Sequence, residues 1–219
     1  MDKKTKSYGC CACIGAAGVA LMPLSSVMIA RGGFVINQYM NGTFTAKTPG
    51  GQTVQLKMET EYPFDDKVKI TVNVEKPEMF KLKLRIPNFC KDGMIVDGKF
   101  EAAPNTAYYL ACKEWNNGDT IELDFDIKAK VKVLNGKASV TRGCVVYAID
   151  SRIQDIDVSV SDKIVADEPI EKEFNCRDAR LFTFDNGAKV KMVDYASAGN
   201  KWDDRSIVVS AWLDMDTQE

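Results

Sequence analysis

The sequence has 219 residues, of which 45% are hydrophobic and 27% are charged, and this composition is typical of a folded protein. Its 29 Lys and Arg residues against 31 Asp and Glu residues leave a formal net charge of -2, so no nucleic-acid partner is predicted. The complete absence of histidine excludes a Ser-His or Cys-His dyad and a His-containing zinc site made by this chain alone.

The N-terminal segment is apolar but is interrupted by glycine and proline residues. Residues 7–30 carry no charge and follow a basic start, which on composition resembles a secretory signal peptide. However, Gly15, Gly18 and Pro23 interrupt the segment, which makes it a poor signal core and a poor membrane span. We therefore favour a buried helix that Pro23 kinks or divides. No convincing signal peptide is predicted, and the location is left open between bacterial cytoplasm and periplasm.

Beyond Gly32-Gly33 the hydrophobic pattern alternates, which predicts strands with one buried face. The strongest pattern runs over 67–87, where two alternating runs flank Pro77, and we predict an antiparallel hairpin there. Further strands are predicted over 34–39, 54–62, 121–133, 144–149, 182–192 and 207–213. The run 121–133 is long for one strand, so a bend or bulge is expected within it.

Several turn motifs divide these strands. Asp97-Gly98 is typical of a type I′ hairpin, and Asn186-Gly187 predicts a second two-residue turn. Asn135-Gly136 is interpreted as the boundary between two domains. The predicted fold class is mainly β, with two antiparallel β-sandwich domains behind a short N-terminal helical segment. Residues 32–134 would form the first sandwich and residues 135–205 the second.

One cluster has clear chemical potential, namely Cys10, Cys11 and Cys13. Thiolates are soft zinc ligands and strong nucleophiles, so three of them within four residues could begin a metal or nucleophile site. A zinc site needs four ligands, and the remaining cysteines lie singly in predicted strands. The simpler interpretation is that small cysteines pack the start of a helix. The seven cysteines lack the spacing of a disulfide framework and are expected to be mostly reduced.

Other polar and aromatic residues are weaker candidates. The carboxylate pairs Asp65-Asp66, Asp124/Asp126 and Asp203-Asp204 could supply glycosidase acids, although surface charges are the simpler interpretation. Aromatic residues that could stack on sugar rings, or else fill a core, are Trp115, Trp202, Trp212, Tyr108 and Tyr109. Lys128, Lys130 and Lys132 project from one face of a predicted strand, which is typical of a solvated face that blocks edge pairing.

The order of several motifs resembles the C-terminal portion of glycoside hydrolase family 127 and its relatives, the β-L-arabinofuranosidase type. The motifs are Cys10-Cys11 before an apolar helix, Gly33-Phe34-Val35-Ile36-Asn37-Gln38-Tyr39, Glu61-Tyr62-Pro63-Phe64, Leu84-Arg85-Ile86-Pro87-Asn88-Phe89, Trp115-Asn116-Asn117-Gly118-Asp119, Arg142-Gly143-Cys144-Val145-Val146-Tyr147, Asp194-Tyr195-Ala196 and Trp212-Leu213. Each motif is weak alone, but their shared order extends over nearly the whole chain.

The resemblance implies an (α/α)6 catalytic barrel followed by two β-sandwiches. Residues 1–31 would then be the closing helix of the barrel, and residues 206–219 would return to the first sandwich. By the same resemblance Cys10 is the nucleophile and a zinc ligand, and Cys11 is a second zinc ligand. The remaining zinc ligands and the acid/base Glu would come from barrel segments that this sequence does not contain. Zinc is therefore expected in an intact parent and not in this chain.

The sequence also departs from the family pattern. The family often follows its Cys pair with Pro-Pro-Asn, where this sequence has Ala12-Cys13-Ile14, and Cys144 replaces the family's Pro after Arg-Gly. The alternatives are a freestanding carbohydrate-binding module and a thiol metal or redox module. The expected partners are an arabinose-containing plant or bacterial glycan, through the parent enzyme, and a second copy of the chain through residues 12–30. No membrane partner is predicted.

Overall fold

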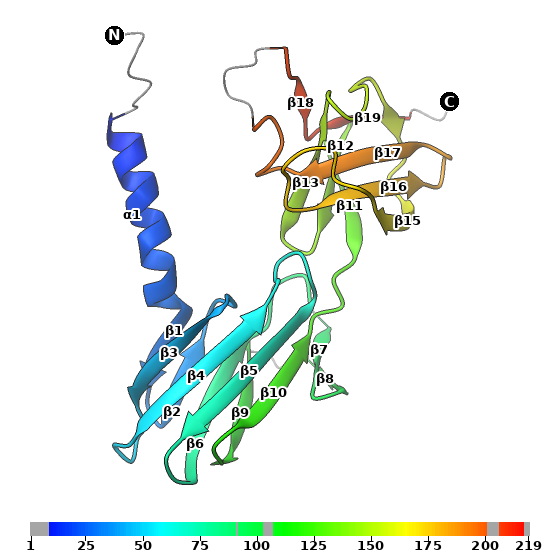
Figure 1. The fold of residues 1–219 in the computed structure, drawn as a ribbon. Coiled ribbons are helices and arrows are strands. Elements are labelled where there is room, and N and C mark those ends of the chain that lie inside the picture. The colour runs from blue at the N-terminus through cyan, green and yellow to red at the C-terminus, as the bar shows by residue number, and fades with distance from the viewer. Residues whose placement is uncertain (1–8, 91, 103–106, 201–205, 217–219) are drawn as a thin grey trace. The chain divides into compact units, whose positions relative to one another are not determined.

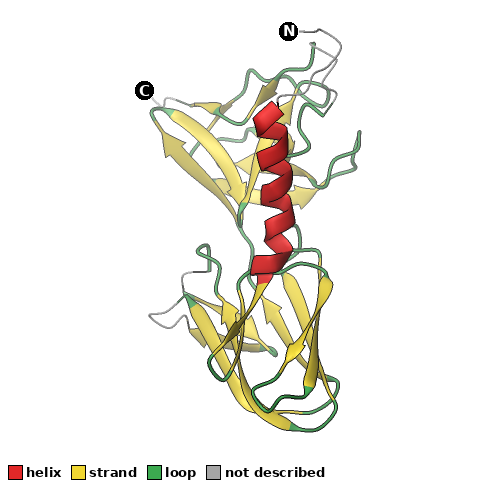
Figure 2. Cartoon of the chain, turned by 90° about the vertical axis from the view of Figure 1, so that its left-hand side faces the viewer, coloured by secondary structure: helices red, strands yellow, loops and turns green. Residues whose placement is uncertain are grey.

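The computed structural model describes residues 9–90, 92–102, 107–200 and 206–216, and the chain forms two compact units, Met1–Asp126 and Ile127–Glu219. In the described part of the chain one helix accompanies many strands, which confirms the mainly β prediction (Figure 2). No described helix is long and apolar enough to cross a membrane.

The first unit begins with helix α1 (Gly9–Ser26), which continues past Pro23 and is not divided there. Proline has no backbone N–H, so Pro23 removes one hydrogen bond from the helix without ending it. The helix is not buried as predicted, because its large apolar side chains, among them Ile14, Val19 and Leu24, are exposed. Residues Val27–Ala30 form strand β1, so the predicted helix to residue 31 is too long. The Asn37 N–H donates to the Ser26 carbonyl (2.7 Å) and Asn37 Nδ2 donates to the Ser25 carbonyl (3.1 Å), which anchors the last turn.

Two sheets make the first unit a β-sandwich (Figure 1). One has the strand order β1-β2-β6-β9 and the other β3-β4-β5-β10-β7-β8. Their bounds are β2 Gly33–Ile36, β3 Gly42–Lys47, β4 Thr53–Thr60, β5 Lys67–Val74, β6 Glu78–Arg85, β7 Gly93–Val96, β8 Lys99–Ala102, β9 Tyr108–Trp115 and β10 Asp119–Asp124. Phe34 of the first sheet meets Phe44 of the second edge to face, with ring centroids 6.1 Å apart.

The predicted hairpin over 67–87 is wrong, although both strands exist with the predicted buried faces. Strand β5 pairs with β4 and β10, while β6 pairs with β2 and β9, so the chain crosses from one sheet to the other between them. Polar side chains hold this crossing. Gln52 Oε1 accepts from the N–H groups of Glu75 (3.1 Å) and Lys76 (2.9 Å), and the Glu78 carboxylate accepts from Thr48 Oγ1 (2.6 Å).

The Asp97-Gly98 turn is confirmed, because both residues have positive φ (48° and 77°) between β7 and β8. The Asn135-Gly136 interpretation is wrong. These residues also have positive φ (51° and 73°) and close the hairpin of β11 (Ala129–Leu134) and β12 (Lys137–Arg142). An Asn-Gly pair favours this turn, so it joins two strands of one unit. The chain passes between units at Asp126–Ile127 instead, inside the predicted run 121–133.

The second unit is also built from strands around its own core. Its further strands are β13 Val145–Asp150, β14 Ser159–Val160, β15 Ile164–Pro169, β16 Ala179–Phe184, β17 Lys189–Asp194, β18 Val209–Ser210 and β19 Leu213–Met215. The predicted hairpin around Asn186-Gly187 is present. However, the Phe184 N–H donates to the Ala188 carbonyl (2.9 Å), so the loop of this hairpin is longer than two residues. Buried Tyr147 and Phe182 pack edge to face at 5.1 Å in this core.

Residues 206–219 were expected to return to the first sandwich, but the C-terminal strands pair within the second unit. Strand β19 pairs with β12 and β14, and β18 pairs with β13, all within the second unit. Leu213 is 1% exposed in the core of that unit, opposite Ala138. Burial of this apolar side chain stabilises the pairing of the C-terminal strand within the second unit.

A buried charge also organises the second unit. The Asp150 carboxylate is fully buried and accepts from Arg152 Nη2 (2.6 Å), Arg152 Nε (2.8 Å) and the Gly199 N–H (2.9 Å). Burial raises the pKa of Asp150, but the hydrogen bonds from Arg152 and Gly199 outweigh it and the net pKa is lowered. The Arg152 guanidinium lies 3.6 Å from the ring centroid of Phe174, which adds a cation–π contact.

Candidate functional site

The cysteine cluster lies at the start of α1. Cys10 and Cys13 are exposed there with free thiols, and the side chain of Cys11 lies outside what the structure describes. Among the described residues no group of three or more His, Cys, Asp or Glu side chains could hold a metal ion. The described donors therefore do not complete a zinc site, which needs four ligands. A zinc site that includes an exposed thiol at this position would need further ligands from outside the described residues.

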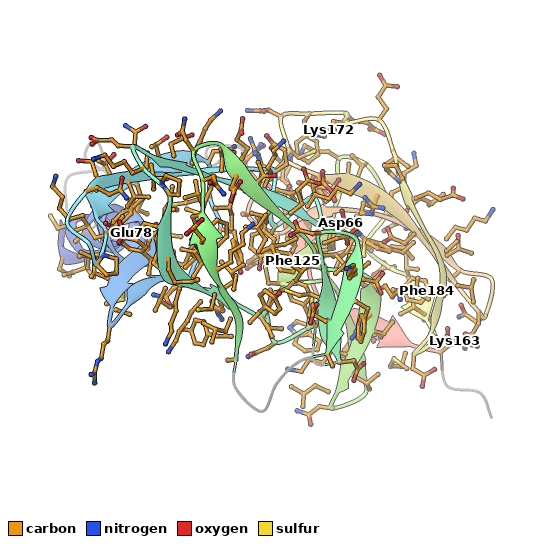
Figure 3. The ribbon with its side chains drawn as sticks, turned by 90° about the horizontal axis from the view of Figure 1, so that it is seen from below. Asp66, Glu78, Phe125, Lys163, Lys172 and Phe184 are labelled. Atoms are coloured by element: carbon orange, nitrogen blue, oxygen red, sulfur yellow. The ribbon has the colours of Figure 1, made fainter. Side chains whose placement is uncertain are left out.

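The predicted carboxylate pairs are only partly brought together. Asp65 Oδ1 accepts from the Asp66 backbone N–H (2.7 Å), while Asp203-Asp204 lies outside the described residues. Figure 3 labels Asp66 and Phe125, and the Phe125 N–H donates to the Asp66 carbonyl (3.0 Å). A side-chain hydrogen bond from Asp66 lowers the pKa of Asp65. Burial raises the pKa of Asp66, and Asp65 and the charge of Asp124 raise it further. The two neighbouring carboxyls therefore differ in acidity, with the pKa of Asp66 raised and the pKa of Asp65 lowered.

A polar hollow of about 600 Å³ lies beside this pair in the first unit. It is lined by Asn41, Glu59, Thr60, Glu61, Asp65, Lys67, Val68, Lys69, Ile95, Gly98, Glu122, Leu123 and Asp124. Asp66, the carboxyl whose pKa is raised, is not among these lining residues. The carboxyl whose pKa is raised is therefore not part of this lining, and no acid catalyst is assigned to the hollow.

A smaller hollow of about 330 Å³ lies beside the last turn of α1. Met22 of the helix, Tyr39, Tyr62 and Arg85 are among its lining residues. Tyr39 Oη donates to the Arg85 carbonyl (2.6 Å), and Gln38 Oε1 is a buried oxygen without a described partner. This hollow marks where the helix joins the sandwich.

The candidate aromatic residues fall into two groups. Trp115 is fully buried, donates from Nε1 to the Phe80 carbonyl (3.0 Å) and stacks on the Phe80 ring, so it is a core residue. Tyr108 and Tyr109 are partly buried, and Trp202 lies outside the described residues. Trp212 is 44% exposed and lines a groove of about 640 Å³ in the second unit.

The same groove gathers one predicted residue and one that the sequence reasoning missed. Lys128, Lys130 and Lys132 are exposed, as predicted for a solvated face, and Lys132 lines the groove. Tyr195, 57% exposed, also lines it. Sequence reasoning did not single out Tyr195 as a binding residue, since only strand pairing brings it near Trp212.

The fold defines this chain as a β-sandwich protein with one apolar helix before its first sandwich. Within that class, residues 33–127 match the family model described as the middle domain of the GH127 β-L-arabinofuranosidases. This match spans β2 to β10 and ends at the limit of the first unit. The resemblance predicted from the order of motifs is thus confirmed. No curated protein matches the sequence.

Solved structures show the same fold. A GH127 β-L-arabinofuranosidase from Geobacillus stearothermophilus T6 matches with a TM-score of 0.77 and 18% identity, covering 94% of this chain and 37% of that one. A structure described as a glycoside hydrolase matches at 0.78 and 18% identity, covering 95% and 40%. A third, described as a GH127 β-arabinofuranosidase, matches at 0.64 and 19% identity, covering 84% and 35%. This chain spans less than half the length of each.

Proposed function

We propose that this chain is the non-catalytic C-terminal β-sandwich region of a glycoside hydrolase. The parent activity would be hydrolysis of terminal β-L-arabinofuranosides through a zinc-held cysteine thiolate. The observation that carries the proposal is the family match over residues 33–127, which covers the first unit from β2 onward. The short coverage of the similar solved chains, 37% and 40%, supports a partial role.

Cys10 and Cys11 keep their proposed roles only in an intact parent. There Cys10 would act as nucleophile and zinc ligand, and Cys11 as a second ligand. Zinc would hold the thiolate and keep it deprotonated. Cys10 is exposed, so groups from another segment have access to it. Because the described residues supply no complete ligand set, no catalytic step is assigned to this chain.

The experiment that tests the proposal is hydrolysis of an aryl β-L-arabinofuranoside by the whole chain in the presence of zinc. We expect no turnover, because a nucleophile without an acid/base partner and a full metal site lacks parts that the mechanism requires. The rival thiol metal module predicts one tightly held zinc per chain, lost when Cys10, Cys11 or Cys13 is replaced by Ala.

We further propose that two copies of the isolated chain associate through residues 12–30. Helix α1 has no acidic residue in its first turn and no basic residue in its last turn. Large apolar side chains on it are strongly exposed, including Ile14 (72%), Val19 (68%) and Leu24 (75%). Water does not favour such an apolar surface, and a symmetric pair of helices would cover it.

Light scattering after size exclusion tests this association on the whole chain and on a variant with Ile14, Val19 and Leu24 replaced by Ser. We expect a dimer for the former and a monomer for the latter. A matched variant, Lys57→Ser, changes an exposed side chain on β4 and should remain dimeric. A monomeric unaltered chain, or a dimer that persists in the triple variant, would contradict the proposal.

A further inference from the structure

The groove in the second unit has a defined lining. Its lining residues are Lys132, Ser139, Thr141, Val146, Tyr195, Val209, Ser210, Ala211 and Trp212. They combine two aromatic rings, four hydroxyl groups including that of Tyr195, and one cation. Within this lining Lys132 is the sole charged residue and no carboxylate is present. Its volume of about 640 Å³ lies within the range of small-molecule sites.

Strand pairing places these side chains on one face. Lys132 of β11 is opposite Ser139 of β12, and Thr141 of β12 is opposite Val146 of β13. Ser139 and Thr141 are two residues apart on one strand and share a face. The pairing of Ala138 with Leu213 brings Ser139 beside Trp212. The groove is thus a surface of the folded sheet.

The two aromatic side chains are held by backbone bonds and left open to solvent. The Tyr195 N–H donates to the Val146 carbonyl (2.9 Å), which fixes the residue at the end of β17. Ser210 Oγ donates to the Trp212 carbonyl (2.7 Å) across the bend between β18 and β19. Tyr195 is 57% exposed and Trp212 is 44% exposed. The backbone at each ring is thus fixed and the rings are accessible, and a Tyr or Trp side chain has only two torsion angles to order when a ligand stacks on it.

Hydroxyl groups in the groove favour a polar ligand. Ser139 and Thr141 line the groove from neighbouring positions on one face of β12. A ligand with hydroxyl groups can exchange hydrogen bonds with them, whereas a purely apolar occupant would displace their water without replacing its hydrogen bonds. The lining therefore favours an occupant that offers both an apolar face and hydroxyl groups.

We propose that this groove binds a neutral glycan, with a sugar ring stacked on Trp212 and Tyr195 and its hydroxyls bonded by Ser139 and Thr141. Sugar rings carry C–H groups on one face and hydroxyls at the edge, which matches this lining. A single lysine is too little charge for a nucleic acid, and the absence of carboxylates in the lining disfavours a cation. The choice of an arabinose-containing probe below rests on the proposed function.

Isothermal titration and affinity electrophoresis of the whole chain with two soluble neutral probes, arabinan and cellohexaose, test the groove. We expect at least one probe to bind and Trp212→Ala to weaken that binding about tenfold or more. Ser139→Ala, which removes only the hydroxyl, should weaken it by about threefold or more. A matched control is Phe100→Ala, which removes a 65% exposed aromatic side chain from the first unit and should leave binding unchanged.

Each outcome decides the proposal. Binding of either probe with the expected dependence on Trp212 supports the groove, even if hydrolysis tests overturn the proposed parent activity. Binding of cellohexaose alone supports the groove and counts against an arabinose-containing ligand. Binding of neither probe, or equal losses in Trp212→Ala and Phe100→Ala, contradicts the proposal. It is also contradicted if an unglycosylated aromatic peptide binds through Trp212 while neither glycan does.

Discussion

Replacing Leu84 by Ala is expected to lower the free energy of unfolding of the first unit by about 2–5 kcal/mol. Leu84 lies on β6, is fully buried, and pairs with Ile36 of β2 and Tyr109 of β9. Removal of a leucine side chain from a site between two neighbouring strands loses its apolar burial and leaves a cavity that rigid strands cannot close. Urea unfolding followed by circular dichroism measures the change, with the transition of the first unit treated separately.

The matched control for this change is Lys83→Ala on the same strand. Lys83 is exposed and points to the opposite face, so its replacement should change the free energy of unfolding by no more than about 0.5 kcal/mol. Equal losses in the two variants would mean that the register of β6 is wrong, because a shift by one residue exchanges the two faces.

Replacing Arg152 by Met is expected to cost the second unit about 3–5 kcal/mol. The change keeps an apolar stem but removes the guanidinium that bonds the fully buried Asp150 carboxylate at 2.6 and 2.8 Å. Asp150 would then be a buried charge with only its backbone donors. The measurement is the denaturant midpoint of the second unit at neutral pH.

The same pair has a predictable pH dependence. The pKa of Asp150 in the folded chain is below its usual value. As pH falls, the unfolded carboxyl, with a pKa of about 3.9, therefore takes up a proton first. The stabilisation is full above that pH and is lost as pH falls through the lower folded pKa. The difference in the free energy of unfolding between the unaltered chain and Arg152→Met should thus become smaller in acid.

Lys137→Met is the control for the buried pair. Lys137 bonds Asp214, but these side chains are 49% and 65% exposed, so water can solvate either charge alone. We expect a loss below about 1 kcal/mol. If Lys137→Met destabilised the second unit as much as Arg152→Met, burial of Asp150 would not be the cause.

Sequence patterns predicted which faces of the strands are buried but not which strands pair. Val68, Ile70, Leu82 and Leu84 are all buried, as their alternation predicted. Alternation is the same for a hairpin and for a crossing between two sheets, so the connection through Pro77 could not be assigned. The crossing depends on Gln52, a residue distant in sequence whose role no local pattern reveals.

The domain boundary was missed for a related reason. Asn135-Gly136 is a strong turn signal, but a turn within a unit and a link between units can use the same residues. The true passage at Asp126–Ile127 lies inside an alternating run, with buried Phe125 before it and buried Ile127 after it. Both side chains continue the same alternation of buried and exposed residues, so the pattern does not mark the passage between the units.

For the candidate sites, too, residue types could be predicted from the sequence, whereas their neighbours in the fold could not. The chemical character of Cys10, Cys11 and Cys13 was evident from residue type alone, whereas the ligands that would complete a zinc site are not among the described residues. Only some residues of the groove could be predicted from the sequence. Trp212 was a candidate from its type, but Tyr195 and Ser139 reach it through strand pairing far along the chain.

The most direct test of the proposed role is zinc-supplemented hydrolysis of an aryl β-L-arabinofuranoside by the purified whole chain under reducing conditions. The unaltered chain and Cys10→Ala are compared at equal concentration, and release of the aryl alcohol is followed over hours. We expect both to match the rate without protein. Zinc-dependent turnover by the unaltered chain that Cys10→Ala abolishes would contradict the account, because the chain would then contain a complete catalytic site.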